Sequence, residues 1–165
     1  MNPHADTLIA SLRNPAKLRL FLFNQLPSAF FSGVRIKELD KNRCVTTVPY
    51  KWFSKNPFRS TYFACLAMAA EMSTGVLVMA HTYKSKPSIS TLVTRLEANY
   101  FKKAIRATNF ACEDGPLVEA AIEKAIATGE GQTIRAKSTG SNDAGELIAE
   151  FFITWSFKAR KEQAK

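Results

Sequence analysis

The segment between Arg59 and Lys84 constrains the fold of this chain more than any other feature. Glu71 is its only charged residue, and the rest is mostly apolar or small. A segment of this length could cross a bilayer as a helix. However, Glu71 lies near its middle, where a carboxylate is costly in hydrocarbon. We therefore expect a long helix from about Arg59 to about Met79 that is buried in the core of a domain, and no membrane association.

Short β-rich runs lie on both sides of this helix. Before it, VRIKEL and CVTTVPY flank the polar turn DKNR, which predicts a hairpin. After it, apolar and polar residues alternate over residues 92–100 and 105–112, and again over GQTIRAKST and ELIAEFFITWSFK, which predicts four strands. The last strand has the clearest period of two, with one face formed by Leu147, Ala149, Phe151, Ile153, Trp155 and Phe157.

Two further helical segments complete the pattern. The N-terminal segment has apolar residues at helical spacing, is interrupted at Asn14-Pro15 and ends at Pro27. A short amphipathic helix follows Gly115-Pro116. The order helix, β, β, long helix, β, β, short helix, β, β predicts an antiparallel α+β fold.

Composition limits domain number and compartment. The 165 residues suffice for one domain, which we place over residues 1–165, with a helical extension in residues 1–27 and the core in residues 33–158. Three cysteines without paired spacing suggest a reducing compartment, which we take to be the cytoplasm. With two histidines and no Cys-x-x-Cys pair, we expect neither a metal site nor a cofactor.

The formal net charge of +9 requires either a partner or a solvated basic surface. A basic nucleic-acid-binding domain is one alternative. Such a domain needs basic residues interleaved with exposed aromatic side chains, whereas we expect most aromatic side chains here on core faces. Nucleic acid is therefore not the expected partner.

Glu71 is the main candidate for chemistry. Its neighbours at helical spacing, among them Ala67, Met68, Gly75 and Val78, are apolar or small. A carboxylate on such a face is costly to bury without partners. Two interpretations remain open: a structural carboxylate, paired with an arginine or bonded across a subunit contact, or a general base or nucleophile in a partly dry pocket.

Three segments resemble one known family. NPFRSTYFACLAMAAEMSTG resembles the central-helix motif of the hot-dog acyl-CoA thioesterases, in particular an uncharacterised thioesterase-like branch of that superfamily. LEANYFKKAIRA is similar to the family's strand with a Y-x-x-x-A corner, and DAGELIAEFFITWSF to its dGelvA strand. The resemblance covers roughly Gly33 to Lys158. It implies a hot-dog fold, in which a curved antiparallel sheet wraps a long central helix, and a homodimer or tetramer.

The resemblance also implies an activity, the hydrolysis of an acyl-CoA thioester. Asn56 matches the family's loop asparagine and would orient a water or the acyl carbonyl, although it could instead cap a helix that starts at Pro57. Glu71 matches the family's acid, which acts as a general base or nucleophile. Tyr62 stands at the usual histidine position, and Phe63 and Ala64 stand at the glycine positions. There, N–H groups at the helix start would contact the thioester carbonyl.

The basic residues Lys102, Lys103 and Arg106 would hold the phosphates of coenzyme A. The chain departs from the family pattern because the His-Gly pair is absent. That departure favours a second alternative, a catalytically silent hot-dog module that binds an acyl group or acyl-CoA.

Overall fold

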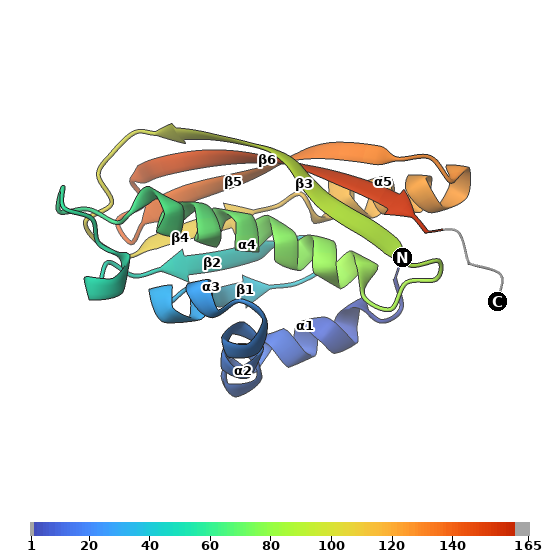
Figure 1. Ribbon diagram of the computed structural model, residues 1–165, viewed down its shortest axis with the longest axis horizontal. Coiled ribbons are helices and arrows are strands. Elements are labelled where there is room, and N and C mark those ends of the chain that lie inside the picture. The colour runs from blue at the N-terminus through green and yellow to red at the C-terminus, as the bar shows by residue number, and fades with distance from the viewer. Residues whose placement is uncertain (1, 161–165) are drawn as a thin grey trace.

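The long apolar helix predicted from the sequence is α4 (Phe63–Thr82), which lies across the concave face of a curved sheet (Figure 1). The computed structural model describes residues 2–160. Leu66 and Leu77 are buried, as predicted. By length and composition α4 could cross a membrane, but most of it is buried inside the protein, as in the core helix of a soluble domain.

α4 begins at Phe63, later than the predicted start near Arg59. The Asn56 side chain accepts hydrogen bonds from the backbone N–H of Phe58 (3.0 Å) and of Ser60 (3.2 Å). These bonds close the loop on itself, and Arg59 adopts a positive φ of 59° that no helix accommodates. The Asn56-Pro57 pair therefore lies in a closed loop before α4 and does not start the helix.

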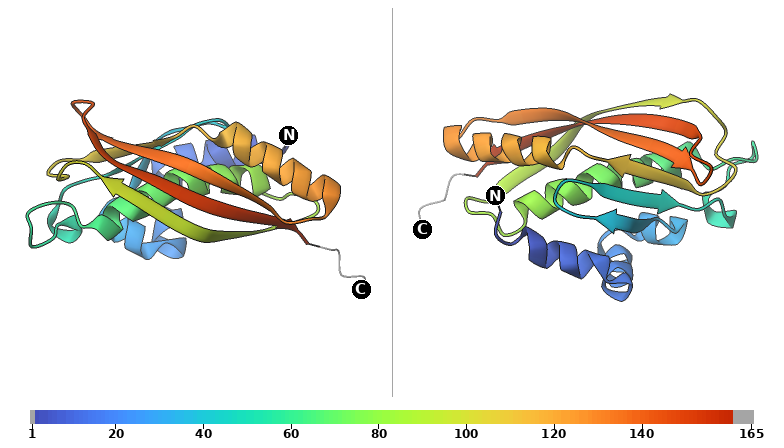
Figure 2. Two further views of the ribbon diagram at one scale, coloured as in Figure 1. Left: turned by 90° about the horizontal axis from the view of Figure 1, so that it is seen from above. Right: turned by 180° about the vertical axis from the view of Figure 1, so that it is seen from behind.

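Six antiparallel strands form one sheet in the order β1-β2-β4-β5-β6-β3. The strands are β1 (Arg35–Leu39), β2 (Cys44–Val48), β3 (Ile89–Tyr100), β4 (Thr108–Cys112), β5 (Gln132–Asn142) and β6 (Leu147–Ala159). Figure 2 shows from two other sides how the long strands β3, β5 and β6 bend across the molecule. The predicted antiparallel α+β class is confirmed.

The core lies between this sheet and α4. The period of two in β6 is confirmed, because Phe151, Ile153 and Phe157 are fully buried. Polar side chains in the core are bonded across the same interface, so they fix how the helix sits on the sheet. The bonds join Thr46 Oγ1 to the Ala69 carbonyl (2.6 Å), Ser73 Oγ to Ser138 Oγ (2.8 Å), and Trp155 Nε1 to Thr74 Oγ1 (3.0 Å).

The N-terminal segment is helical, as predicted, but contains three helices: α1 (Ala5–Arg13), α2 (Pro15–Gln25) and α3 (Pro27–Ser32). α1 packs against β1 and α4, and α3 packs against α4. Pro27 was expected to end the helical segment, yet it occupies the first turn of α3. Proline suits that position because its missing N–H would have no helical partner there.

Two short elements complete the fold. α5 (Gly115–Thr128) packs against α4, β5 and β6. A single 3₁₀ turn, η1 (Trp52–Ser54), precedes the loop that leads into α4 and contacts α3.

The two edges of the sheet differ. β1 is short, contains a register shift between Ile36 and Glu38, and is covered by α1. β3 is twelve residues long, and within residues 2–160 it pairs only with β6. Long unpaired edges are usually protected in stable proteins, and β3 is the long edge left open within the described residues.

Candidate functional site

Glu71 lines a narrow apolar cavity of about 270 Å³ between α4 and the N-terminal helices, which we call the Glu71 cavity. α4 forms one wall of the cavity with Glu71 and the residues one turn away from it. Thr91 of β3 and Trp155 of β6 also line the cavity. The opposite wall is made of apolar side chains of α1, α2 and neighbouring segments: Leu12, Leu18, Phe21, Leu22, Leu26 and Ile36.

The Glu71 carboxylate has no partner of its own in this cavity. Among the residues that the structure describes, it forms no ion pair and no side-chain hydrogen bond. Burial among apolar groups disfavours the charged form and raises the pKa of Glu71 above its ordinary value. Within one protomer the expectation of an arginine partner is therefore not met. The raised pKa favours the protonated form of the side chain.

Gly75 makes room for this carboxylate. A β-carbon at this position would lie 2.8 Å from Glu71 Oε1 and 3.5 Å from the Trp155 ring. Gly75 lies one helical turn after Glu71, and the carboxylate lies directly over the glycine.

A second, wider cavity of about 720 Å³ opens at the N-terminus of α4, and we call it the helix-terminus cavity. The loop before α4, the first turn of the helix and the end of β3 line it. Its residues include five of the predicted site positions, Asn56, Tyr62, Phe63, Lys102 and Lys103. Tyr100, the last residue of β3, and the adjacent Phe101 form another wall.

The first turn of α4 has no cap. The N-cap residue Tyr62 makes no side-chain capping bond, and no acidic residue lies in the first turn. The N–H groups of Phe63 and Ala64 donate to no acceptor within residues 2–160. Such free N–H groups carry the positive end of the helix dipole and suit an oxygen with partial negative charge.

The Asn56 side chain forms its hydrogen bonds within its own loop. Besides accepting from Phe58 and Ser60, its amide donates to Ser60 Oγ (3.2 Å) and to the Thr61 carbonyl (3.5 Å). The asparagine thus holds the loop that shapes the helix-terminus cavity.

The three predicted phosphate-binding residues lie together. Lys102, Lys103 and Arg106 line a hollow of about 370 Å³ that adjoins the helix-terminus cavity, since both lysines line both spaces. Lys102 Nζ lies 2.6 Å from Glu146 Oε1, and this bond lowers the pKa of Glu146. Lys103 has no such carboxylate partner among the described residues, so its charge is available to a ligand.

The predicted site residues therefore form two groups. No residue lines both the Glu71 cavity and the helix-terminus cavity. Glu71 lies five residues after Leu66, which lines the second space, and this spacing corresponds to a rise of about 7.5 Å along α4. Within one protomer the acid and the free N–H groups do not share a cavity.

Sequence reasoning missed the wall opposite Glu71. Phe21 and Leu22 come from α2 and Leu26 follows it, and their apolar spacing predicted a helix but not the surface against which it packs. Trp155 was predicted on the inner face of β6, although nothing in the sequence placed it next to Glu71.

The raised pKa of Glu71 has a consequence for stability. The folded state holds this proton more tightly than the unfolded chain, so the stability of the fold falls as pH rises from the ordinary value of 4.5 through the raised pKa. We predict that Glu71→Gln, which carries no charge, raises the thermal midpoint at neutral pH. The gain should shrink towards about pH 4, where wild-type Glu71 is protonated as well.

The matched control is Glu150→Gln, which removes a carboxylate paired with Lys137 at the surface (2.5 Å). It should give no stabilisation at neutral pH. Calorimetric scans from acidic to neutral pH check both variants. A Glu71→Gln protein that is less stable than wild type at neutral pH would show that the carboxylate has a stabilising partner.

Comparison with known proteins agrees with this architecture. The model of the family DUF4442, described as a domain of unknown function, matches residues 19–157. A search of curated proteins finds no match.

Solved structures share the fold. A Pseudomonas aeruginosa protein of unknown function, named a probable thioesterase, has a TM-score of 0.74 and 17% identity over 89% of this chain and 97% of that chain. A protein of unknown function from Chlorobaculum tepidum has a TM-score of 0.74 and 19% identity over 92% of this chain and 99% of that chain. A thioesterase from Haemophilus influenzae has a TM-score of 0.60 and 11% identity over 92% of this chain and 95% of that chain.

At these identities the similarity establishes the fold, and the family match covers most of the chain. The chain belongs to the DUF4442 family, and it shares the hot-dog fold of these solved structures.

Proposed function

We propose that this protein is a homodimeric acyl-thioester hydrolase in which Glu71 is the general base. The observation that carries the proposal is the partnerless carboxylate in an apolar cavity. A buried carboxylate without a structural partner destabilises the fold. A raised pKa brings such a group nearer to the operating pH, which favours general-base catalysis.

The lining of the Glu71 cavity indicates the kind of substrate. Apart from Glu71 and two threonines, it offers only apolar atoms and the Trp155 ring. A space of about 270 Å³ with such walls suits an aliphatic acyl chain whose thioester group lies at Glu71. The basic hollow at Lys103 and Arg106 suits the phosphates of a carrier such as coenzyme A.

Exposure on β3 supports a dimer. Leu96 and Tyr100 pair with Ile153 and Ala149 of β6, which are fully buried on the concave face. Leu96 and Tyr100 therefore point to the same face, yet they are 45% and 48% exposed. A second copy that pairs along β3 would cover these side chains and remove the open edge.

Antiparallel pairing would also join the two cavities. The start of β3 borders the Glu71 cavity through Thr91, and its end borders the helix-terminus cavity through Tyr100. A two-fold axis near the middle of β3 sets the end of one strand beside the start of the other. The free N–H groups of one protomer would then approach Glu71 of its partner, and the complete site would form between subunits.

The chemistry follows from this arrangement. The Glu71 carboxylate accepts a proton from water while the water oxygen bonds to the thioester carbonyl carbon. The carbonyl oxygen gains negative charge and accepts hydrogen bonds from the N–H groups of Phe63 and Ala64 of the other protomer. The carbon–sulfur bond then breaks, the proton passes from Glu71 to the leaving sulfur, and a carboxylic acid and a thiol are released.

One observation favours the alternative, a binding module without activity. Tyr62 and Phe63 stand at the helix start with ring centroids 4.9 Å apart, and Phe63 occupies a position where a glycine would leave the N–H groups open. In that case the thioester would bind without turnover. For either function we propose a cytoplasmic location, since the three buried cysteines are free thiols.

Replacement of Glu71 tests the proposal. Glu71→Gln keeps the shape of the side chain and removes the base, so turnover of acyl-CoA substrates should fall on the order of a hundredfold or more. Hydrolysis is measured across saturated acyl-CoAs of increasing length, with Glu150→Gln as the control that keeps activity. Near-full activity of Glu71→Gln would refute its role as a base. Binding of acyl-CoA by wild type without hydrolysis would establish the binding module instead.

The dimer has a separate test. Wild type should sediment as a dimer at micromolar concentration. Leu96→Glu places a charge where the partner would cover β3 and should yield monomers. Leu117→Glu on α5 alters a side chain of similar exposure (46%) far from β3 and should remain dimeric. A monomeric wild type, or a Leu96→Glu protein that stays dimeric, would contradict pairing along β3.

A further inference from the structure

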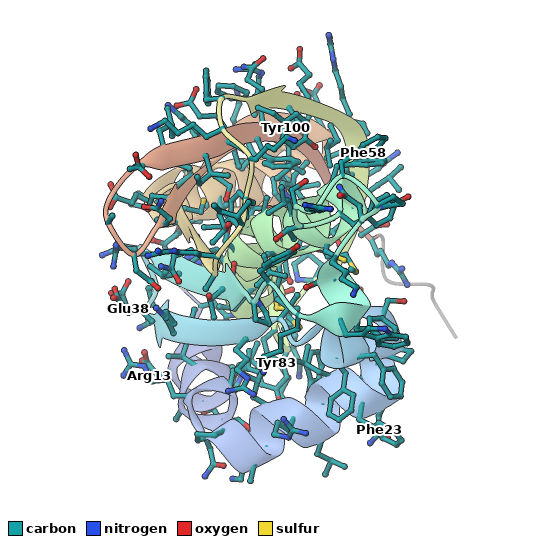
Figure 3. All side chains as sticks on the ribbon, turned by 90° about the vertical axis from the view of Figure 1, so that its left-hand side faces the viewer. Arg13, Phe23, Glu38, Phe58, Tyr83 and Tyr100 are labelled. Carbon is teal, nitrogen blue, oxygen red and sulfur yellow. The ribbon has the colours of Figure 1, made fainter. Side chains whose placement is uncertain are left out.

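A continuous apolar surface is exposed on the N-terminal helices and the adjoining 3₁₀ turn. We call it the aromatic face, and define it as Leu20, Phe23, Leu26, Phe31, Trp52 and Phe53. Each of these side chains is between 43% and 79% exposed, and Trp52 is the most exposed. Phe23 is seen at the lower right of Figure 3. Contiguous exposed apolar surface of this kind marks an interaction site.

The rings of this face contact one another in a chain. Phe23 and Phe31 each pack edge-on against Phe30 with centroids 5.3 Å apart. Phe31 lies 6.0 Å from Phe53, which lies 6.3 Å from Trp52. α2 and η1, far apart in sequence, thus present one surface.

Packing within the protomer does not explain this surface. α2 is already anchored through Leu18 and Leu22, which are buried. Its outward side still carries Leu20 and Phe23, where a helix at the surface of a soluble protein normally has polar residues. The proposed pairing along β3 does not use these side chains either, because none of them lies on that strand.

The segments that carry the aromatic face contain cations and no carboxylates. Residues 7–37 and residues 41–70 contain no aspartate or glutamate. The Arg19 guanidinium lies 4.9 Å from the centre of the Phe30 ring, and Lys51 precedes Trp52 in the chain. Besides Arg19, the exposed cations in these segments are Arg13, Lys17, Arg35, Lys37, Lys51, Lys55 and Arg59.

The exposed apolar side chains and the nearby cations together favour one class of binding partner over the others. A second copy of the chain docked through the same face would bring like charges together. Single-stranded nucleic acid binds to open ring faces, whereas these rings pack mostly edge to face and lie beside the aliphatic Leu20 and Leu26. Exposed aromatic and aliphatic side chains with surrounding lysine and arginine match the boundary between lipid headgroups and acyl chains.

We propose that the aromatic face binds the surface of an anionic phospholipid bilayer. Trp52, Phe53, Phe31 and the exposed side of α2 enter the headgroup boundary, and Arg19 and Lys51 contact lipid phosphates. The molecule lies on the membrane and does not span it, since α4 stays in the core. The absence of a spanning helix does not predict this kind of contact, and the exposed aromatic residues depart from the expectation that most aromatic side chains lie in the core. This binding is independent of the proposed hydrolysis.

The two tryptophans of the chain provide the measurement. Trp52 is 79% exposed and Trp155 is buried, so a shift in emission on binding reports Trp52. The full chain is mixed with vesicles of pure phosphatidylcholine or with vesicles that contain about 30% phosphatidylglycerol. We expect co-sedimentation and a blue shift only with the anionic vesicles, both weakened by salt. Trp52→Phe should lose the blue shift.

Matched charge reversals test where the contact lies. Arg19→Glu with Lys51→Glu should lower partitioning by at least about tenfold. Lys124→Glu with Lys158→Glu makes the same change in net charge on α5 and β6 and should bind as wild type does. Equal losses in both pairs, no blue shift of Trp52, or stronger binding to a single-stranded oligonucleotide than to vesicles would each overturn the proposal.

Discussion

α4 is apolar on nearly every side, and the rest of the molecule is arranged to enclose it. The sheet covers the side that carries Ala69, Ser73 and Leu77, and α5 packs against the helix as well. The sheet alone cannot close around a mostly apolar helix of twenty residues, so α1 and α3 cover part of what remains. The concave face near β3 remains open in one protomer. In the proposed dimer a second copy would cover it and complete the enclosure of α4.

Glu71 is the only charged residue of this helix. The described residues around it leave space for its carboxylate but provide no cation to pair with it. Gly75 leaves space for the carboxylate, and Trp155 is held beside it by its bond to Thr74 (3.0 Å). An apolar replacement would fit these surroundings better, since desolvation raises the pKa of the acid and disfavours its charge. A residue that reduces stability in this way is expected at functional sites.

Much of the fold could be predicted because strong periodicity and long apolar runs have few structural solutions. The length and single charge of residues 60–83 predicted a buried helix, and alternation in residues 147–157 predicted a half-buried strand. Details that depend on side-chain hydrogen bonds could not be predicted. Asn56 next to proline is compatible with a helix start or a closed loop, and only its bonds to Phe58 and Ser60 distinguish them.

The site was harder to predict than the fold, for a physical reason. Glu71, Tyr62 and Lys103 could be found from residue type and resemblance, but the two cavities and their separation depend on tertiary packing. The expectation that most aromatic side chains lie in the core was also wrong for α2, α3 and η1. An apolar helix pattern shows which residues are hydrophobic, but not whether the fold has enough interior to bury them.

The central claim is that a complete site forms between two subunits, and mixed dimers test it most directly. Phe63→Pro removes the first free N–H of α4, and the extended backbone of Tyr62 (ψ 132°) accepts a following proline. Phe63→Ala, which keeps that N–H, serves as the control.

Co-expressed Glu71→Gln and Phe63→Pro chains should regain about a quarter of wild-type turnover. About half of the dimers are then mixed, and each mixed dimer has one complete site. Each variant alone should be nearly inactive. Activity of the mixture no higher than that of the separate variants would contradict a site shared between subunits.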